Sequence, residues 1–181
     1  MNGRDSASSA SGLTEDQSVI YAGSFSKVLF PSLRIGYLVL PESLVQVFRK
    51  GKEVHDAGSS ILDQATAAIF IEEGFFSTHV RRMRKLYRER LEVFLGEAKK
   101  RMSGWLKFPV LEAGMDATGL LMPGSDEASL AKKLAASGVD VPPLSSYSIK
   151  ACAPGLVFGF TAFPQAQIRS AMLTVAKKIG P

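Results

Sequence analysis

Residues 23–41 read GSFSKVLFPSLRIGYLVLP and are the most informative part of this sequence. Within about a dozen positions they bring together the amine of Lys27, the hydroxyls of Ser24 and Ser26, and the guanidinium of Arg34. A lysine amine can form a Schiff base with an aldehyde, and arginine and serine side chains bind phosphate oxygens through hydrogen bonds. The segment therefore predicts a turn between two apolar strands that holds a phosphate group and captures an aldehyde.

Two other interpretations of this segment are open. Ser24-Phe25-Ser26-Lys27 also fits S-x-x-K, the nucleophile motif of β-lactamases and penicillin-binding proteins. In those enzymes the serine opens a helix, whereas Pro31 disfavours a helix that continues from this motif. Their partner motifs S-D-N and K-T-G are absent, the nearest strings being Ser125-Asp126-Glu127 and Ala117-Thr118-Gly119. The plainer alternative is a strand, a turn and a strand, with Lys27 and Arg34 exposed to solvent.

The composition is that of a globular protein. The chain has 181 residues, enough for one sizeable domain or two small ones, and 46% of them are hydrophobic. No run of about eighteen apolar residues could span a membrane, and residues 1–17 lack the apolar core of a secretory signal. Cys152 is the only cysteine, which excludes an intramolecular disulfide and fits a reducing compartment. We therefore expect a cytoplasmic protein without membrane contact.

Basic residues crowd one segment, residues 81–90, which reads RRMRKLYRER. Nucleic-acid binding needs a groove-entering motif or stacking aromatic residues in a sheet, and neither is evident. The net charge of +5 permits an anionic ligand but demands no nucleic acid. We interpret the segment as a solvated helix face and expect no nucleic acid to bind through this chain. We interpret His55 and His79 as surface or packing residues and predict no metal site, because no set of metal ligands gathers around them.

Apolar periodicity and chain breakers predict strands alternating with helices, which indicates an α/β fold. Strands are expected over residues 18–23, 33–40, 108–112, 118–122, 139–141 and 155–162. Helices are expected from Pro41 to about Val54 and over residues 60–73, 77–102, 126–137 and 165–179. The long helix, within 77–103, bridges two parts, 18–76 and 104–181. Residues 1–17 have almost no large apolar side chain and are expected to be a flexible tail.

The whole string over residues 23–41 closely resembles the lysine segment of fold-type I pyridoxal-phosphate enzymes of aminotransferase class I and II. Within that class it is most similar to the aminotransferase-like domain of MocR-type regulators of the GntR family. The resemblance implies that Lys27 is the Schiff-base lysine and that Ser24, Ser26 and Arg34 hold the phosphate of pyridoxal 5'-phosphate. It also implies a homodimer and a small amino compound as substrate or effector.

The same resemblance assigns the predicted parts. The fold would be the C-terminal half of the fold-type I, aspartate-aminotransferase-like architecture. Residues 18–76 would be the end of the large domain that binds pyridoxal phosphate. Residues 77–103 would be the bridging helix, and residues 104–181 the small C-terminal α/β domain.

Two departures from the family pattern bear on function. In the family, the aspartate under the pyridinium nitrogen and the other ring contacts lie upstream of the lysine. Only 26 residues precede Lys27 here, and Asp5 and Asp16 among them do not match that pattern. In many family enzymes, the arginine of an R-L-x-F-like run binds the substrate carboxylate. The corresponding residues here, 156–160, read LVFGF and contain no arginine.

Three functional readings follow from the resemblance and its departures. The first is an aminotransferase, or part of one, that we expect to be inactive as this isolated chain. The second is an effector-sensing, pyridoxal-phosphate-binding module of a transcription regulator, without its DNA-binding part. The third is an inactive remnant.

Overall fold

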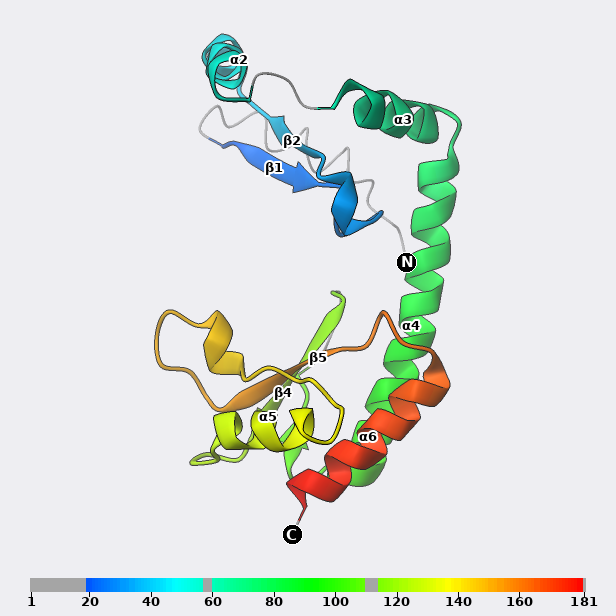
Figure 1. The fold of residues 1–181 in the computed structure, drawn as a ribbon, viewed down its shortest axis with the longest axis vertical. Coiled ribbons are helices and arrows are strands. Elements are labelled where there is room, and N and C mark those ends of the chain that lie inside the picture. Colours follow the sequence, from blue (N-terminus) through cyan, green and yellow to red (C-terminus); the bar gives the residue numbers. More distant parts are fainter. Residues whose placement is uncertain (1–18, 57–59, 110–113, 181) are drawn as a thin grey trace. The chain divides into compact units, whose positions relative to one another are not determined.

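A computed structural model describes residues 19–56, 60–109 and 114–180 (Figure 1). The chain divides into two compact units, Met1–Val80 and Arg81–Pro181. Helix α4 (Phe75–Met102) begins in the first unit and ends in the second. The tail expected over residues 1–17 lies outside the described residues. No described helix combines the length and the apolar character needed to cross a membrane.

The first unit is built on a two-stranded antiparallel hairpin of β1 (Tyr21–Ser24) and β2 (Gly36–Val39). Tyr21 lies opposite Val39, and Ser24 lies opposite Gly36. The ring of Tyr37 lies over Gly23 so closely that a Cβ at Gly23 would come within 2.3 Å of it. A side chain at position 23 would therefore require the Tyr37 ring to move.

The strand predicted over residues 33–40 is shorter than expected. Pro31–Leu33 form a 3-10 turn, η1, because proline presets the backbone for a tight turn. Arg34 then adopts a left-handed conformation, with φ 51° and ψ 29°. These two features hold the chain out of the sheet until Gly36.

Two helices follow the hairpin, and both were predicted. Helix α2 spans Glu42–Asp56, and α3 spans Ile61–Glu72. The hydroxyl of Ser60 caps α3 by accepting a hydrogen bond from the Asp63 amide at 3.3 Å. The predicted end of this helix is confirmed by Gly74, whose φ of 75° only glycine adopts at little cost.

Helix α4 begins earlier than the sequence suggested. The sequence predicts this helix from residue 77, whereas the helix starts at Phe75, directly after Gly74. The hydroxyl of Ser77 donates to the Gly74 carbonyl at 2.9 Å. A hydroxyl near a helix start can bond a carbonyl as well as an amide, so Ser77 does not mark the start of this helix.

The second unit carries a three-stranded antiparallel sheet in the order β3–β4–β5. The strands are β3 (Leu106–Lys107), β4 (Asp116–Leu121) and β5 (Gly155–Gly159). The helices are α5 (Glu127–Ala135), a 3-10 turn η2 (Leu144–Tyr147) and α6 (Gln165–Ile179). The order of elements agrees with the predicted mixture of strands and helices.

Two strands that the sequence predicts in this unit do not form at the predicted residues that the structure describes. Residues 139–141 form no strand, although the segment runs beside β5 and the Val157 amide donates to the Pro142 carbonyl at 3.0 Å. Pro142 and Pro143 have no amide hydrogen, so a regular ladder cannot form there. The strand expected over residues 108–112 is replaced by the shorter β3, and residues 110–112 lie outside the described part.

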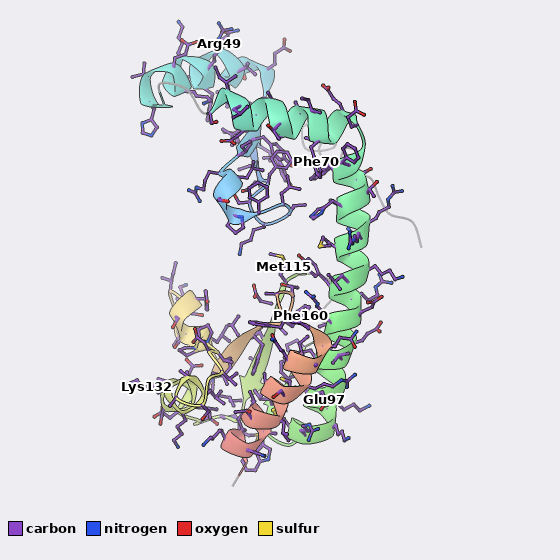
Figure 2. The ribbon with its side chains drawn as sticks, turned by 45° about the vertical axis from the view of Figure 1, so that its right-hand side comes forward. Arg49, Phe70, Glu97, Met115, Lys132 and Phe160 are labelled. Carbon is purple, nitrogen blue, oxygen red and sulfur yellow. The ribbon has the colours of Figure 1, made fainter. Side chains whose placement is uncertain are left out.

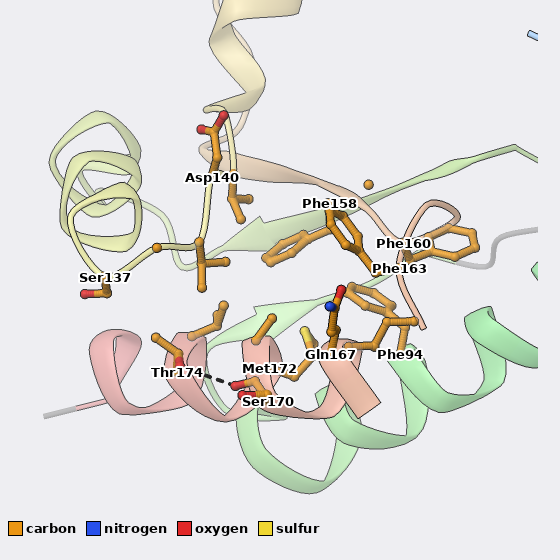
Figure 3. A pocket seen from close by; sticks show the side chains of 17 residues that line it. Phe94, Ser137, Asp140, Phe158, Phe160, Phe163, Gln167, Ser170, Met172 and Thr174 are labelled. Atoms are coloured by element: carbon orange, nitrogen blue, oxygen red, sulfur yellow. Dashed lines mark hydrogen bonds between the residues drawn. The ribbon is translucent and has the colours of Figure 1, made fainter. Parts of the chain in front are cut away.

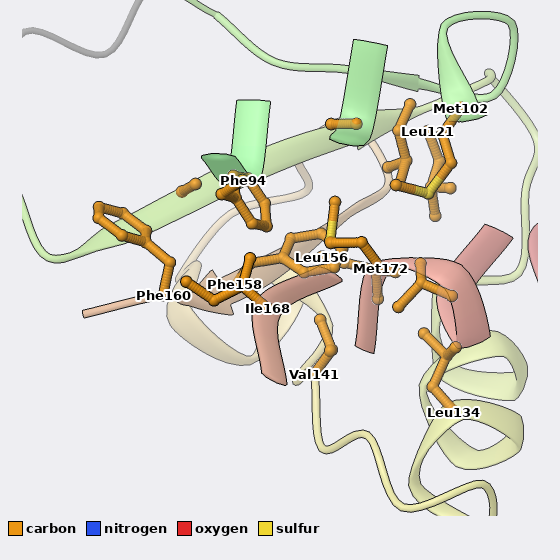
Figure 4. Close-up of a cluster of buried hydrophobic side chains, with 14 residues drawn as sticks. Phe94, Met102, Leu121, Leu134, Val141, Leu156, Phe158, Phe160, Ile168 and Met172 are labelled. Atoms are coloured by element: carbon orange, nitrogen blue, oxygen red, sulfur yellow. The ribbon is translucent and has the colours of Figure 1, made fainter. Parts of the chain in front are cut away.

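The core of the second unit lies between one face of this sheet and the helices (Figure 4). In β4, Ala117, Gly119 and Leu121 are buried while the residues between them are more exposed. The Phe94 ring of α4 contacts three other aromatic rings at centroid distances of 5.2–5.9 Å, those of Phe108, Phe158 and Phe160. Phe158 of β5 thus lies in the core of the second unit.

A buried carboxylate joins two helices of the second unit (Figure 2). Glu97 of α4 is 8% exposed. It accepts hydrogen bonds from Arg101 at 2.7 Å and from Arg169 of α6 at 3.0 Å. The Arg101 hydrogen bond is the main cause that holds the pKa of Glu97 below its ordinary value of 4.5, against the opposing effect of burial and with further help from Arg169.

This cluster predicts an acid-sensitive contribution to stability. Because the folded pKa of Glu97 is lowered, its contribution is complete above pH 4.5 and is lost as pH falls through the folded pKa. Thermal unfolding of the wild type and of Glu97→Gln should differ at pH 7, with the variant less stable, and this difference should shrink as the pH falls from 4.5 through the lowered pKa of Glu97. A difference that stays constant between pH 7 and pH 3 would contradict this assignment.

Candidate cofactor site

Lys27 lies in a tight turn after β1, here called the lysine turn, residues 25–29. The amides of Val28 and Leu29 donate to the Phe25 carbonyl at 3.1 and 2.8 Å. The amide of Phe25 donates to the Ile35 carbonyl at 3.0 Å, which anchors the turn beside the start of β2. The side chain of Lys27 is exposed. The hairpin therefore presents this amine on a turn that is hydrogen-bonded at its base.

The other three predicted site residues lie at the same end of the hairpin. Ser24 ends β1, and its hydroxyl accepts a hydrogen bond from the Ser26 amide at 3.2 Å. Arg34 lies two residues before Gly36, the partner of Ser24 in the register. The fold thus brings an amine, two hydroxyls and a guanidinium around one turn, although seven positions separate Lys27 from Arg34.

The backbone at Arg34 is strained. Among the described residues it is the only one other than glycine with a positive φ. A left-handed conformation costs a residue with a Cβ roughly 1–2 kcal/mol. Non-glycine residues in such conformations cluster at functional sites. The strain therefore marks Arg34 as a candidate functional residue.

The two cationic side chains are available to a ligand. Across the part of the chain that the structure describes, neither the Lys27 amine nor the Arg34 guanidinium makes a hydrogen bond or an ion pair. Both residues are exposed. A guanidinium with serine hydroxyls suits a phosphate monoester, and a lysine amine suits an aldehyde. The donor set therefore fits a compound that carries both groups.

Sequence reasoning missed the residues that support the lysine turn. The Phe25 ring packs on Tyr37 at 5.4 Å and edge-on to Phe76 at 5.8 Å. The His79 ring lies 3.1 Å from the Val28 carbonyl. The Phe76 and His79 contacts are tertiary, linking positions about 50 residues apart, so no local pattern could have indicated them.

The hairpin face also carries a tyrosine pair. The rings of Tyr21 and Tyr37 lie 6.1 Å apart. Their side-chain hydrogen bond, together with partial burial, raises the pKa of the Tyr37 phenol above its ordinary value. Tyr37 therefore stays a neutral phenol at physiological pH and supports the turn through packing.

Two grooves lie away from the four predicted site residues. One, of about 1120 Å³, runs in the first unit between the hairpin and α2. The other, of about 470 Å³, lies in the second unit beside α6 (Figure 3). Its floor includes Phe158 and Phe160, which are nearly fully buried in the core. Its only charged lining residue is Asp140. Neither groove holds the lysine and phosphate-binding groups.

Comparisons with known proteins give consistent results. Residues 1–170 match the family described as aminotransferase class I and II. The probable rhizopine catabolism regulatory protein MocR of Rhizobium meliloti is 40% identical over 134 residues, which cover 74% of this chain and 27% of that protein. Aromatic-amino-acid aminotransferase 1 of Thermococcus litoralis is 26% identical over 166 residues, 91% of this chain and 40% of that protein.

Solved aminotransferases share the fold. The multiple substrate aminotransferase of Thermococcus profundus has a TM-score of 0.81 at 26% identity, over 89% of this chain and 40% of that one. An archaeal alanine:glyoxylate aminotransferase has a TM-score of 0.84 at 23% identity, over 92% of this chain and 42% of that one. The chain thus has a partial fold-type I architecture and spans less than half the length of these relatives.

The family also indicates the cofactor. The solved LysN of Thermus thermophilus, an α-aminoadipate aminotransferase, holds N-(5'-phosphopyridoxyl)-L-leucine and shares this fold with a TM-score of 0.81. Family and structural relatives together indicate pyridoxal 5'-phosphate, which carries the phosphate and the aldehyde that the lysine turn suits. On the match over residues 1–170, the chain belongs to the aminotransferase class I and II family.

Proposed function

We propose that this chain supplies the lysine-bearing part of a pyridoxal-phosphate-binding, aminotransferase-like domain. Lys27 would hold the cofactor by its amine, which reacts readily with an aldehyde. Arg34, Ser24 and Ser26 hold the phosphate. The single observation that carries this proposal is the strained Arg34 beside the lysine turn, which has no hydrogen bond or ion pair among the residues that the structure describes.

Each residue has a definite task in this proposal. The guanidinium of Arg34 binds two phosphate oxygens in a planar fork, and the serine hydroxyls add further hydrogen bonds. Fixing the phosphate orients the aldehyde toward Lys27. The bound cofactor supplies an electron sink for chemistry at the carbon that bears the substrate amine. Lys27 would also act as the base that moves the proton at that carbon.

Chemical labelling tests the role of Lys27. The chain is mixed with pyridoxal phosphate and reduced with borohydride, and the added mass is mapped to peptides. We expect the label to favour the Lys27 peptide over exposed lysines such as Lys132. In Lys27→Arg the label should fall on the remaining lysines without preference. An even distribution in the wild type would refute the assignment.

A second candidate function is an effector-sensing module of a transcription regulator. The 40% identity to a regulatory protein favours it. The run over residues 156–160, which includes Val157 of β5, also favours it. In many family enzymes this run carries the arginine that binds the substrate carboxylate, and here it contains no arginine. Genomic sequence upstream of the coding region decides between the two. If the upstream sequence encodes a winged-helix segment in the same reading frame, the regulator is supported. If the complete reading frame encodes no such segment, the enzyme is supported.

The exposed apolar residues of the first unit bear on its partners. Val54, Ile61 and Leu62 are 90%, 83% and 76% exposed. Among the described residues the hairpin is a sheet of two strands, and no further strand pairs with its outer edges. We infer that the rest of the family domain covers these surfaces, that the complete protein is a cytoplasmic homodimer, and that its ligand is a small amino compound. Sedimentation of the complete protein as a monomer would contradict the dimer.

A further inference from the structure

Helix α4 reaches the lysine turn through two side chains, one on each side of Lys27. The Phe76 ring packs edge-on against Phe25, two residues before the lysine, at 5.8 Å. The His79 ring lies 3.1 Å from the carbonyl of Val28, the residue after the lysine. Phe76 and His79 are three residues apart and therefore lie on one face of the helix. All of these residues belong to the first unit.

The direction of the His79 hydrogen bond follows from its chemistry. A backbone carbonyl only accepts, so Nε2 of His79 must carry the proton and donate it. The ring is half-buried, and its other contact is edge-on to Phe70 at 6.5 Å. The hydrogen bond therefore fixes a carbonyl inside the turn from a side chain that is itself held by packing.

We infer that His79 is a positioning residue for Lys27, acting through the Val28 carbonyl. The backbone on both sides of Lys27 is held, while its side chain is exposed and unpaired among the described residues. A lysine that must meet an aldehyde in a fixed place gains from a rigid backbone, because less conformational freedom is lost when the bond forms. This inference rests on the proposed function and assigns a new residue to it.

Three variants separate the donor from the packing. His79→Gln keeps an amide N–H that can reach the Val28 carbonyl, whereas His79→Leu fills similar space without a donor. His55→Leu is the matched control, since His55 is exposed on α2 and makes no hydrogen bond or ion pair among the described residues. Circular dichroism of all variants checks that the helices and the hairpin are retained.

Labelling with pyridoxal phosphate and borohydride gives the first readout. Loss of one net hydrogen bond predicts that His79→Leu lowers the preference for Lys27 over Lys132 about fivefold. His79→Gln and His55→Leu should keep the preference of the wild type. An unchanged preference in His79→Leu would overturn the inference. An equal loss in His79→Gln would also overturn it, because the donor would then not matter.

Amide hydrogen exchange gives a second readout that needs no cofactor. In His79→Leu, the peptide that contains Val28 and Leu29 should exchange faster, because both amides donate within the turn. His79→Gln should protect it as the wild type does. If the wild type shows no labelling preference for Lys27, the proposed function fails. Exchange that is equal in all variants refutes the positioning role itself.

Discussion

Phe94→Ala is expected to lower the free energy of unfolding of the second unit by about 3–5 kcal/mol. Phe94 is 3% exposed and its ring contacts those of Phe108, Phe158 and Phe160. Truncation removes apolar contacts and leaves a cavity between α4 and the sheet. Denaturant unfolding followed by circular dichroism measures the loss.

A matched truncation on the surface provides the control. Ile149 belongs to the same unit and is fully exposed, so Ile149→Ala should change the free energy of unfolding by less than about 0.5 kcal/mol. If Phe94→Ala cost no more than this control, the aromatic cluster could not be the core of the second unit.

Arg34→Lys is expected to weaken pyridoxal phosphate binding about tenfold or more, which corresponds to about 1.4 kcal/mol. Lysine keeps the charge but loses the planar fork that binds two phosphate oxygens. Arg49→Lys is the matched control, because Arg49 is exposed on α2 and, within the described part of the chain, pairs with Glu53 one turn away. Titration with pyridoxal phosphate compares the variants. Equal affinities would make Arg34 a surface charge.

The stability of a second variant at position 34 tests independently whether the backbone of Arg34 is strained. Asparagine tolerates the left-handed conformation better than arginine does. Arg34→Asn should therefore bind the cofactor weakly without a loss in the free energy of unfolding. A large loss of stability would show that Arg34 holds the fold together and that its φ of 51° is not a cost borne for binding.

The sequence predicted best those elements that have clear ends. Helix α6 spans Gln165–Ile179, as expected, between Pro164 and Gly180. Its apolar residues Ile168, Met172 and Val175, spaced about one turn apart, are all buried. Periodicity and breakers here agree with the tertiary packing, so local information was sufficient.

Elsewhere local patterns and the fold disagree. Residues 139–141 have an apolar, strand-like pattern, but the two prolines that follow remove the amides that a ladder needs. The left-handed Arg34 could not be foreseen, since arginine rarely adopts that conformation. The contact of His79 with the lysine turn joins residues 51 positions apart and depends on how α4 packs. The residue types indicated the chemistry of the site. The packing and hydrogen bonds that hold the lysine turn in place could be seen only in the fold.

A comparison of two aldehydes tests most directly whether Lys27 and the phosphate-binding residues form one site. The chain is labelled in parallel with pyridoxal phosphate and with pyridoxal, which lacks the phosphate, and reduced with borohydride. Charge-assisted hydrogen bonds to the phosphate predict that Lys27 is labelled at least about tenfold more efficiently by the phosphorylated aldehyde than by pyridoxal. Lys132, which has no phosphate-binding residues assigned to it, should show a much smaller preference. An equal ratio of the two labels at Lys27 and at Lys132 would contradict the site.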